Sequence, residues 1–237
     1  MTFMKTYVKQ AAWVLAIAGA MSTAVFAAER EAKIEDRLDA SADTLMDMMK
    51  ASDHGIPQNI IDHARCVIVI PGMKKAGFII GAKYGRGFAV CRRPGGVGWS
   101  APAGMRSEGG SFGFQIGGSD TDVVLLVNGD KGMKHVLEDK FTLGGEATVA
   151  AGPVGRDASA QTDAMLHAEM LSYSRSHGLF AGISLEGATM RADVDTNKEL
   201  YGRDATNREI LTGDFKTPAM AMKFEHALNR ESATRAK

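Results

Sequence analysis

The chain has 237 residues, 28 basic and 28 acidic side chains, a formal charge of zero, and 45% hydrophobic residues. This balance argues against a nucleic-acid-binding protein, in which a strong excess of basic residues is expected. After the first 27 residues, no segment is long and apolar enough to span a bilayer. Any functional charge must therefore come from how the charges are distributed along the chain.

The first 27 residues have the pattern of a secretory signal peptide. Lys5 and Lys9 precede the apolar run 11–20 (AAWVLAIAGA), and the residues up to Ala27 suit cleavage after that position. We expect export to a bacterial periplasm, with an uncleaved anchor as the alternative. Cleavage leaves 26 basic and 28 acidic side chains, a charge of −2, on about 210 residues. That size suits one domain, or one domain with helical additions. Peripheral association of the exported protein with a membrane is a separate expectation.

Two helices are expected before the first strand. Residues 29–50 place apolar side chains at helical spacing, at Ile34, Leu38, Ala42, Leu45 and Met49. The polar face of this segment is acidic. A second, short helix is predicted from Pro57 to Ala64, because proline is favoured at the first helical position.

The middle of the chain is predicted to be a glycine-rich β core. The run 66–70 (CVIVI) indicates a buried strand ended by Pro71-Gly72, and 76–90 is strand-like but interrupted by glycines. Further strand segments are 97–101, 111–117, 123–127, 144–149, 165–174 and 179–185, with a helix from Asp130 to about Lys140. Glycines two or four apart along a strand leave one face bare, which favours a tightly curved sheet.

The end of the chain is predicted to be helical. Thr206 and Glu209 have the spacing of a capping box, and Thr217-Pro218 begins a last helix. The expected class is α+β, with a mainly antiparallel core that forms a curved sheet, sandwich or barrel. We divide one domain, 28–237, into a helical lead-in (28–64), a β core (65–194) and a helical tail (195–237).

Positive charge is concentrated between His63 and Ser107. This stretch has no Asp or Glu and eight basic residues, namely Arg65, Lys74, Lys75, Lys83, Arg86, Arg92, Arg93 and Arg106. A field of one sign needs an anionic partner: a phosphate-bearing surface, a nucleic acid, or the acidic helix of the same chain.

Two pairs of cations within this stretch are the main candidates for the binding site. Lys74 and Lys75 follow Pro71-Gly72, and Arg92 and Arg93 precede Pro94, so we expect both pairs to project from turns and to act together. Lys83 and Arg86 would extend the patch.

Cys66 and Cys91 are the two cysteines. An oxidising compartment permits a disulfide between them, and two buried thiols are the alternative.

No motif for catalysis, metal or cofactor binding is convincing. Residues 109–113 (GGSFG) match the nucleophile-elbow pattern at Ser111, but the following residues alternate like a strand instead of starting a helix. Candidate partners such as Asp163, His167 and His177 are what any chain of this length supplies. Asp193 begins an incomplete calcium-loop pattern, which is more typical of a turn or a helix cap. We expect no enzyme, no metal and no cofactor, with a serine hydrolase as a remote alternative.

Taken together, several segments resemble the SYLF family of lipid-binding domains. They occur in the family's order and cover nearly all of residues 56–202: ARCVIVIPGMKKAGFIIGAKYGRG (64–87), WSAPA (99–103), GGSFGFQIGGSDTDVVLLV (109–127), GGEATVAAGPVGR (144–156), SYSRSHGLFAGISLEGA (172–188) and NKELYG (197–202). The resemblance implies a compact domain that binds phospholipids without catalysis. Eukaryotic members bind phosphoinositides and associate with actin. For a secreted bacterial member we expect an anionic phospholipid such as phosphatidylglycerol or cardiolipin; protein partners are unknown, and a structural or protein-interaction module is the alternative.

Overall fold

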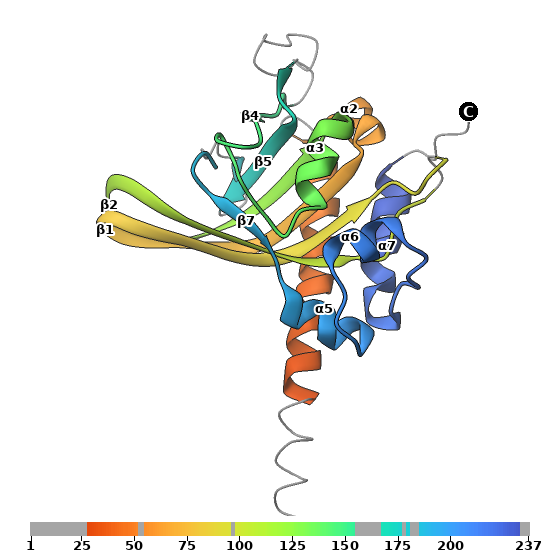
Figure 1. Ribbon diagram of the computed structural model, residues 1–237. Coiled ribbons are helices and arrows are strands. Elements are labelled where there is room, and N and C mark those ends of the chain that lie inside the picture. The colour runs from red at the N-terminus through yellow and green to blue at the C-terminus, as the bar shows by residue number, and fades with distance from the viewer. Residues whose placement is uncertain are drawn as a thin grey trace, which may run out of the picture. The chain divides into compact units, whose positions relative to one another are not determined.

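A computed structural model describes residues 28–51, 55–95, 98–154, 167–176, 179–180 and 185–232, without the side chains of 76–80, 111–119 and 179–180 (Figure 1). The chain divides into two compact units, Met1–Asp36 and Arg37–Lys237. The strands and the later helices all belong to the second unit. The predicted signal peptide, residues 1–27, lies outside the described residues. Within the part described, no helix is long and apolar enough to cross a membrane.

Seven described strands form one sheet, so the predicted α+β class is confirmed. They are β1 (Cys66–Cys91), β2 (Ala103–Val127), β3 (Lys140–Thr142), β4 (Val149–Ala151), β5 (Met170–Ser176), β6 (Leu179–Phe180) and β7 (Thr189–Ala192). β2 is the central strand, because β1, β5 and β7 all pair with it. Every pairing is antiparallel except that of β4 with β5.

β1 and β2 are far longer than the sequence pattern predicts. The expected strand end at Pro71-Gly72 is wrong: β1 continues through it, with a register shift between Ile70 and Met73. Gly72 has φ +55°, which a β-bulge tolerates, and proline is tolerated in a strand at bulges and edges because it donates no ladder hydrogen bond. The segments 111–117 and 123–127, expected as separate strands, are likewise parts of one strand, β2.

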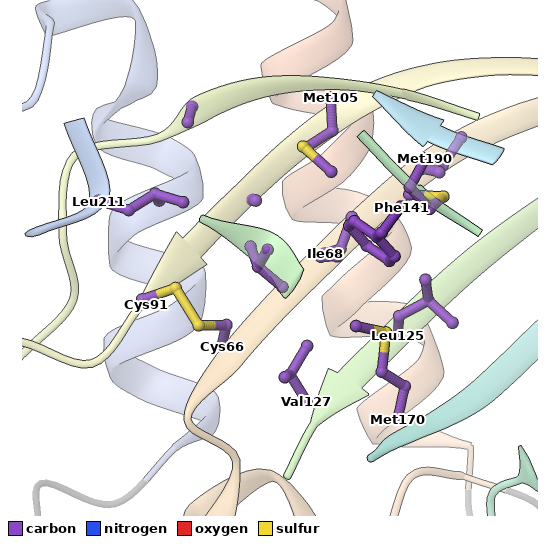
Figure 2. Close-up of a cluster of buried hydrophobic side chains, with 14 of the residues drawn as sticks. Cys66, Ile68, Cys91, Met105, Leu125, Val127, Phe141, Met170, Met190 and Leu211 are labelled. Atoms are coloured by element: carbon purple, nitrogen blue, oxygen red, sulfur yellow. A yellow bond between two sulfur atoms is a disulfide. The ribbon is translucent and has the colours of Figure 1, made fainter. Parts of the chain in front are cut away.

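β1 doubles back on itself. Its first and last residues, Cys66 and Cys91, are joined by a disulfide with 4.0 Å between the Cα atoms (Figure 2). A straight strand of 26 residues would separate these atoms by roughly 80 Å, so the chain must reverse between them. By cross-linking residues 25 positions apart, this disulfide contributes about 3 kcal/mol of stability in the chain-entropy model.

We call residues 66–75 the outgoing limb of β1, 76–82 the bend, and 83–91 the returning limb. The two limbs touch where the returning limb has glycine. A Cβ added at Gly85 would lie 2.5 Å from Ile70 Cγ2 and 3.0 Å from Met73 Cγ, and one at Gly87 would lie 2.8 Å from Ile70 Cα. These two glycines are therefore the close-packing devices that a curved sheet needs. β2 follows the same course, because its register with β1 runs from Cys66–Val127 to Ala89–Ala103 (Figure 1).

The main core is a cluster of buried apolar side chains around the disulfide. Ile68, Met105, Leu125, Phe141 and Met190 belong to it and lie together in Figure 2. They come from β1, β2, β3 and β7.

The helical segments agree with the sequence except at some boundaries. They are a helix over 28–50, α2 (Gln58–His63), α3 (Gly129–Val136), α5 (Val194–Tyr201), α6 (Asn207–Thr212), the 3-10 helix η2 (Ala219–Ala221) and α7 (Met222–Glu231). The capping box of Thr206 and Glu209 is confirmed. α3 ends four residues earlier than expected, and residues 144–146 form a turn before β4 instead of a strand.

Candidate functional site

We call the paired strands β1 and β2 the ribbon. Three lysines of β1 lie near the bend, and we call them the ribbon lysines: Lys74, Lys75 and Lys83. Lys74 and Lys75 end the outgoing limb and Lys83 begins the returning limb. The pKa of Lys83 is lowered, first by partial burial and then by the positive charge of Lys75. Lys75 and Lys83 are thus close enough to repel each other, although eight positions separate them in the sequence. The doubling back of β1 gathers this charge.

Lys74 has an exposed carboxylate nearby. Lys74 Nζ lies 3.6 Å from Asp120 Oδ1, with side chains 74% and 65% exposed. An ion pair this exposed is worth about 0–1 kcal/mol, so it leaves Lys74 able to exchange Asp120 for another anion. Tyr84, next to Lys83, is 46% exposed. The end of the ribbon therefore combines cations with an exposed aromatic side chain.

Arg86 serves a structural contact. Its Nε and Nη2 donate hydrogen bonds of 2.6 and 2.7 Å to the carboxylate of Asp193, whose side chain is 1% exposed. Burial raises the pKa of Asp193, but hydrogen bonds from Arg86 and Thr196 outweigh this effect and lower it. The Asp193 side chain also accepts from Thr196 N as the N-cap of α5, which confirms a cap in place of a calcium loop. No sequence signal joined Arg86 to Asp193, because 107 positions separate them.

Arg92 and Arg93 directly follow Cys91, the last residue of β1, and so lie away from the bend. The Arg92 guanidinium is buried 4.1 Å from the centre of the Trp99 ring, and Arg93 Nε donates to the Trp99 carbonyl. A turn does follow at Pro94-Gly95, as predicted. Both arginines adjoin the disulfide, however, and nine residues of strand, roughly 30 Å, separate Cys66 from Lys75. The structure does not bring the two cation pairs together.

Three carboxylates in the second half of the first helix pair with cations outside the basic stretch. From Arg37 onward, Asp39 and Asp43 contact Lys223 of α7, and Asp47 contacts Arg175 of β5. In the same part of the chain, Arg65 of the basic stretch pairs with Asp130. Asp39, Asp43 and Asp47 thus have partners outside the basic stretch.

Ser111 is not in a nucleophile elbow. It lies within β2, opposite Gly81, whereas the elbow requires a sharp turn between a strand and a helix. Its proposed partners Asp163 and His177 lie outside the described residues. The structural context of a serine hydrolase is missing around Ser111.

Comparisons with known proteins agree on one family. The pattern of the Ysc84 family, described as "Las17-binding protein actin regulator", matches residues 108–231. The SH3 domain-containing YSC84-like protein 1 of Rattus norvegicus is 37% identical over 178 residues, which are 75% of this chain and 52% of that protein. Protein YSC84 of Saccharomyces cerevisiae is 35% identical over 173 residues, 72% of this chain and 36% of that protein. The chain thus spans about half the length, or less, of these curated relatives.

Proposed function

Because the chain belongs to the Ysc84 family, the family of SYLF domains, we propose that it binds anionic phospholipid through the ribbon lysines and catalyses no reaction. One observation carries the proposal: the two limbs of β1 pack together where Gly85 meets Ile70 and Met73, and this doubling back brings Lys75 and Lys83 near each other. In keeping with this, the positive charge of Lys75 adds to the effect of partial burial in lowering the pKa of Lys83. An anion between them relieves this repulsion. Arg86 and Arg92 are left out of the proposed surface because they are engaged in internal contacts.

The expected affinity is modest and sensitive to salt. Each cation near an anionic membrane surface is worth about 1 kcal/mol. Three ribbon lysines then favour an anionic over a neutral bilayer by about a hundredfold. This preference should fall as salt shortens the screening length from about 10 Å at 0.1 M.

Charge reversal tests the lysines. The double variant Lys75→Glu/Lys83→Glu should bind vesicles of phosphatidylcholine with phosphatidylglycerol at least tenfold more weakly than the unaltered protein, because two attractions become repulsions. Binding is measured by co-sedimentation at low salt. The matched control is Lys134→Glu/Lys216→Glu, which changes the net charge equally at two exposed positions away from the ribbon.

Two results would count against this function. If the unaltered protein binds neutral and anionic vesicles equally at low salt, charge does not drive binding. If the control weakens binding as much as the ribbon variant does, net charge and not the ribbon surface is responsible.

The place of action is also a proposal. The signal-like residues 1–27 support export, and phosphatidylglycerol or cardiolipin would then be the natural ligand. N-terminal sequencing of the exported protein should begin at Ala28; retention of Met1 would contradict cleavage.

A protein-interaction role is the second candidate. The family description names Las17 binding and actin regulation, and these properties belong to the proteins so described. In this chain the same lysines would then dock an acidic protein surface. In that case the ribbon variant should bind vesicles as the unaltered protein does.

A further inference from the structure

The bend of the ribbon has an unusual composition. Residues 76–82 read AGFIIGA and residues 109–119 read GGSFGFQIGGS, so neither segment has a charged residue. Together they contain six large apolar residues, namely Phe78, Ile79, Ile80, Phe112, Phe114 and Ile116. A ribbon segment in water normally carries polar or charged residues, so this composition indicates an apolar environment.

Among the described strands, only β1 and β2 pair with each other at the bend. Residues 76–82 pair with 110–118, for example Gly77 with Gly117 and Ile80 with Phe112. The other strands that the structure describes beside β2 stop short of the bend, because β7 pairs only as far as Glu108 and β5 only as far as Asp122. An isolated two-stranded ribbon is marginally stable in water, and an apolar one needs a partner that supplies a hydrophobic environment.

The charges beside the bend identify the partner. The ribbon lysines flank the apolar segment on both limbs, and Tyr84 is exposed next to Lys83. Cations and aromatic residues around an apolar segment suit the headgroup region of an anionic bilayer, where the cations meet phosphates and the aromatic rings lie at the interface. A second copy of the chain fits less well, because a symmetric contact at the bend would bring like-charged lysines together.

We propose that the bend of the β1–β2 ribbon inserts into the outer part of an anionic bilayer while the ribbon lysines stay at the phosphates. The inference rests on the proposed lipid binding and adds a second, apolar component to it. Salt screens the lysines but not the burial of apolar residues. The inserted bend should therefore leave a part of the binding that survives high salt.

The first test uses the mature chain, residues 28–237, and vesicles of phosphatidylcholine with phosphatidylglycerol in 1 M NaCl. The unaltered protein should still co-sediment, and Ile79→Asp/Phe114→Asp should bind at least tenfold more weakly. The matched control is Val194→Asp/Met222→Asp, at apolar positions 54% and 42% exposed elsewhere, which should bind as the unaltered protein does. Equal binding of the two double variants would overturn insertion.

The second test does not depend on a charged variant folding. In Phe114→Trp, bromine on the lipid acyl chains should quench the new indole, whereas Trp99 is buried in the protein and should stay unquenched. A vesicle-bound Phe114→Trp protein without added quenching would overturn insertion but leave lysine-driven binding intact. If the unaltered protein shows no preference for anionic over neutral vesicles, the proposed function itself is wrong. If Ile79→Asp/Phe114→Asp abolishes a dimer in solution and leaves the fraction of protein bound to vesicles unchanged, the bend is a self-association surface and the inference is wrong.

Discussion

Replacing Gly87 with alanine should lower the free energy of unfolding by at least about 3 kcal/mol. A Cβ at this position would overlap the Val69 carbonyl oxygen and would lie 2.8 Å from both Val69 C and Ile70 Cα. Overpacking against flexible side chains typically costs about 1–3 kcal/mol. Here the obstacle is the backbone of the outgoing limb, which cannot turn aside as a side chain can. The two limbs of β1 would have to separate.

A second glycine of the same ribbon provides the control for this change. Gly110 is also in a strand, and an added Cβ there meets no atom within 4 Å. Gly110→Ala should be neutral or stabilise by up to about 1 kcal/mol, because alanine restricts the unfolded chain. Urea unfolding followed by circular dichroism gives both values. Equal stabilities of the Gly87→Ala and Gly110→Ala proteins would contradict the doubling back of β1.

Replacing Asp193 with alanine should cost about 3–5 kcal/mol. The change removes both hydrogen-bond acceptors of Arg86 and leaves a half-buried guanidinium without its partner, which is the expensive way to break a buried ion pair. It also removes the N-cap of α5, worth about 1 kcal/mol within the same total. Thermal or urea unfolding measures the loss. Asp204→Ala is the control, because the Lys198–Asp204 pair is 63% and 77% exposed and should contribute about 1 kcal/mol at most.

The same residue gives the stability a defined dependence on pH. The pKa of Asp193 is lowered in the folded protein, so the unfolded chain binds its proton more readily. The stability from Asp193 is then fully present above the ordinary carboxyl pKa of about 3.9 and is lost as the pH falls through the folded value. In the Asp193→Ala protein, the free energy of unfolding should therefore fall less steeply as the pH is lowered. If the free energy of unfolding falls equally steeply with pH in both proteins, other carboxyl groups are responsible for the loss of stability in acid.

Local signals predicted much of this fold. The capping box at Thr206 and the cap at Asp193 each involve residues three positions apart, so the sequence contains all of their chemistry. The buried runs 66–70 and 123–127 are also found where the apolar residues predict them. The interpretation of glycines as packing devices is confirmed at Gly85 and Gly87.

Contacts between distant residues were not predictable in the same way. Pro71-Gly72 has the composition of a turn, and only its place in a paired ribbon shows it to be a bulge. The contact of Gly87 with Val69 depends on the reversal of β1, and the pairing of Arg86 with Asp193 depends on the pairing of β1 with β2 and of β2 with β7. No local pattern encodes either arrangement. For the same reason, the sequence grouped Lys74 and Lys75 with Arg92 and Arg93, whereas the fold groups Lys75 with Lys83.

Hydrogen–deuterium exchange of the mature protein on vesicles tests most directly whether the folded-back ribbon is the membrane-binding surface. Amide exchange is compared for the free protein, the protein with phosphatidylcholine vesicles, and the protein with vesicles that also contain phosphatidylglycerol. We predict slower exchange in residues 74–83 and 109–120, and only with the anionic vesicles. Protection confined to other segments, with exchange in the ribbon unchanged while the protein is bound, would contradict a membrane-binding role for the ribbon.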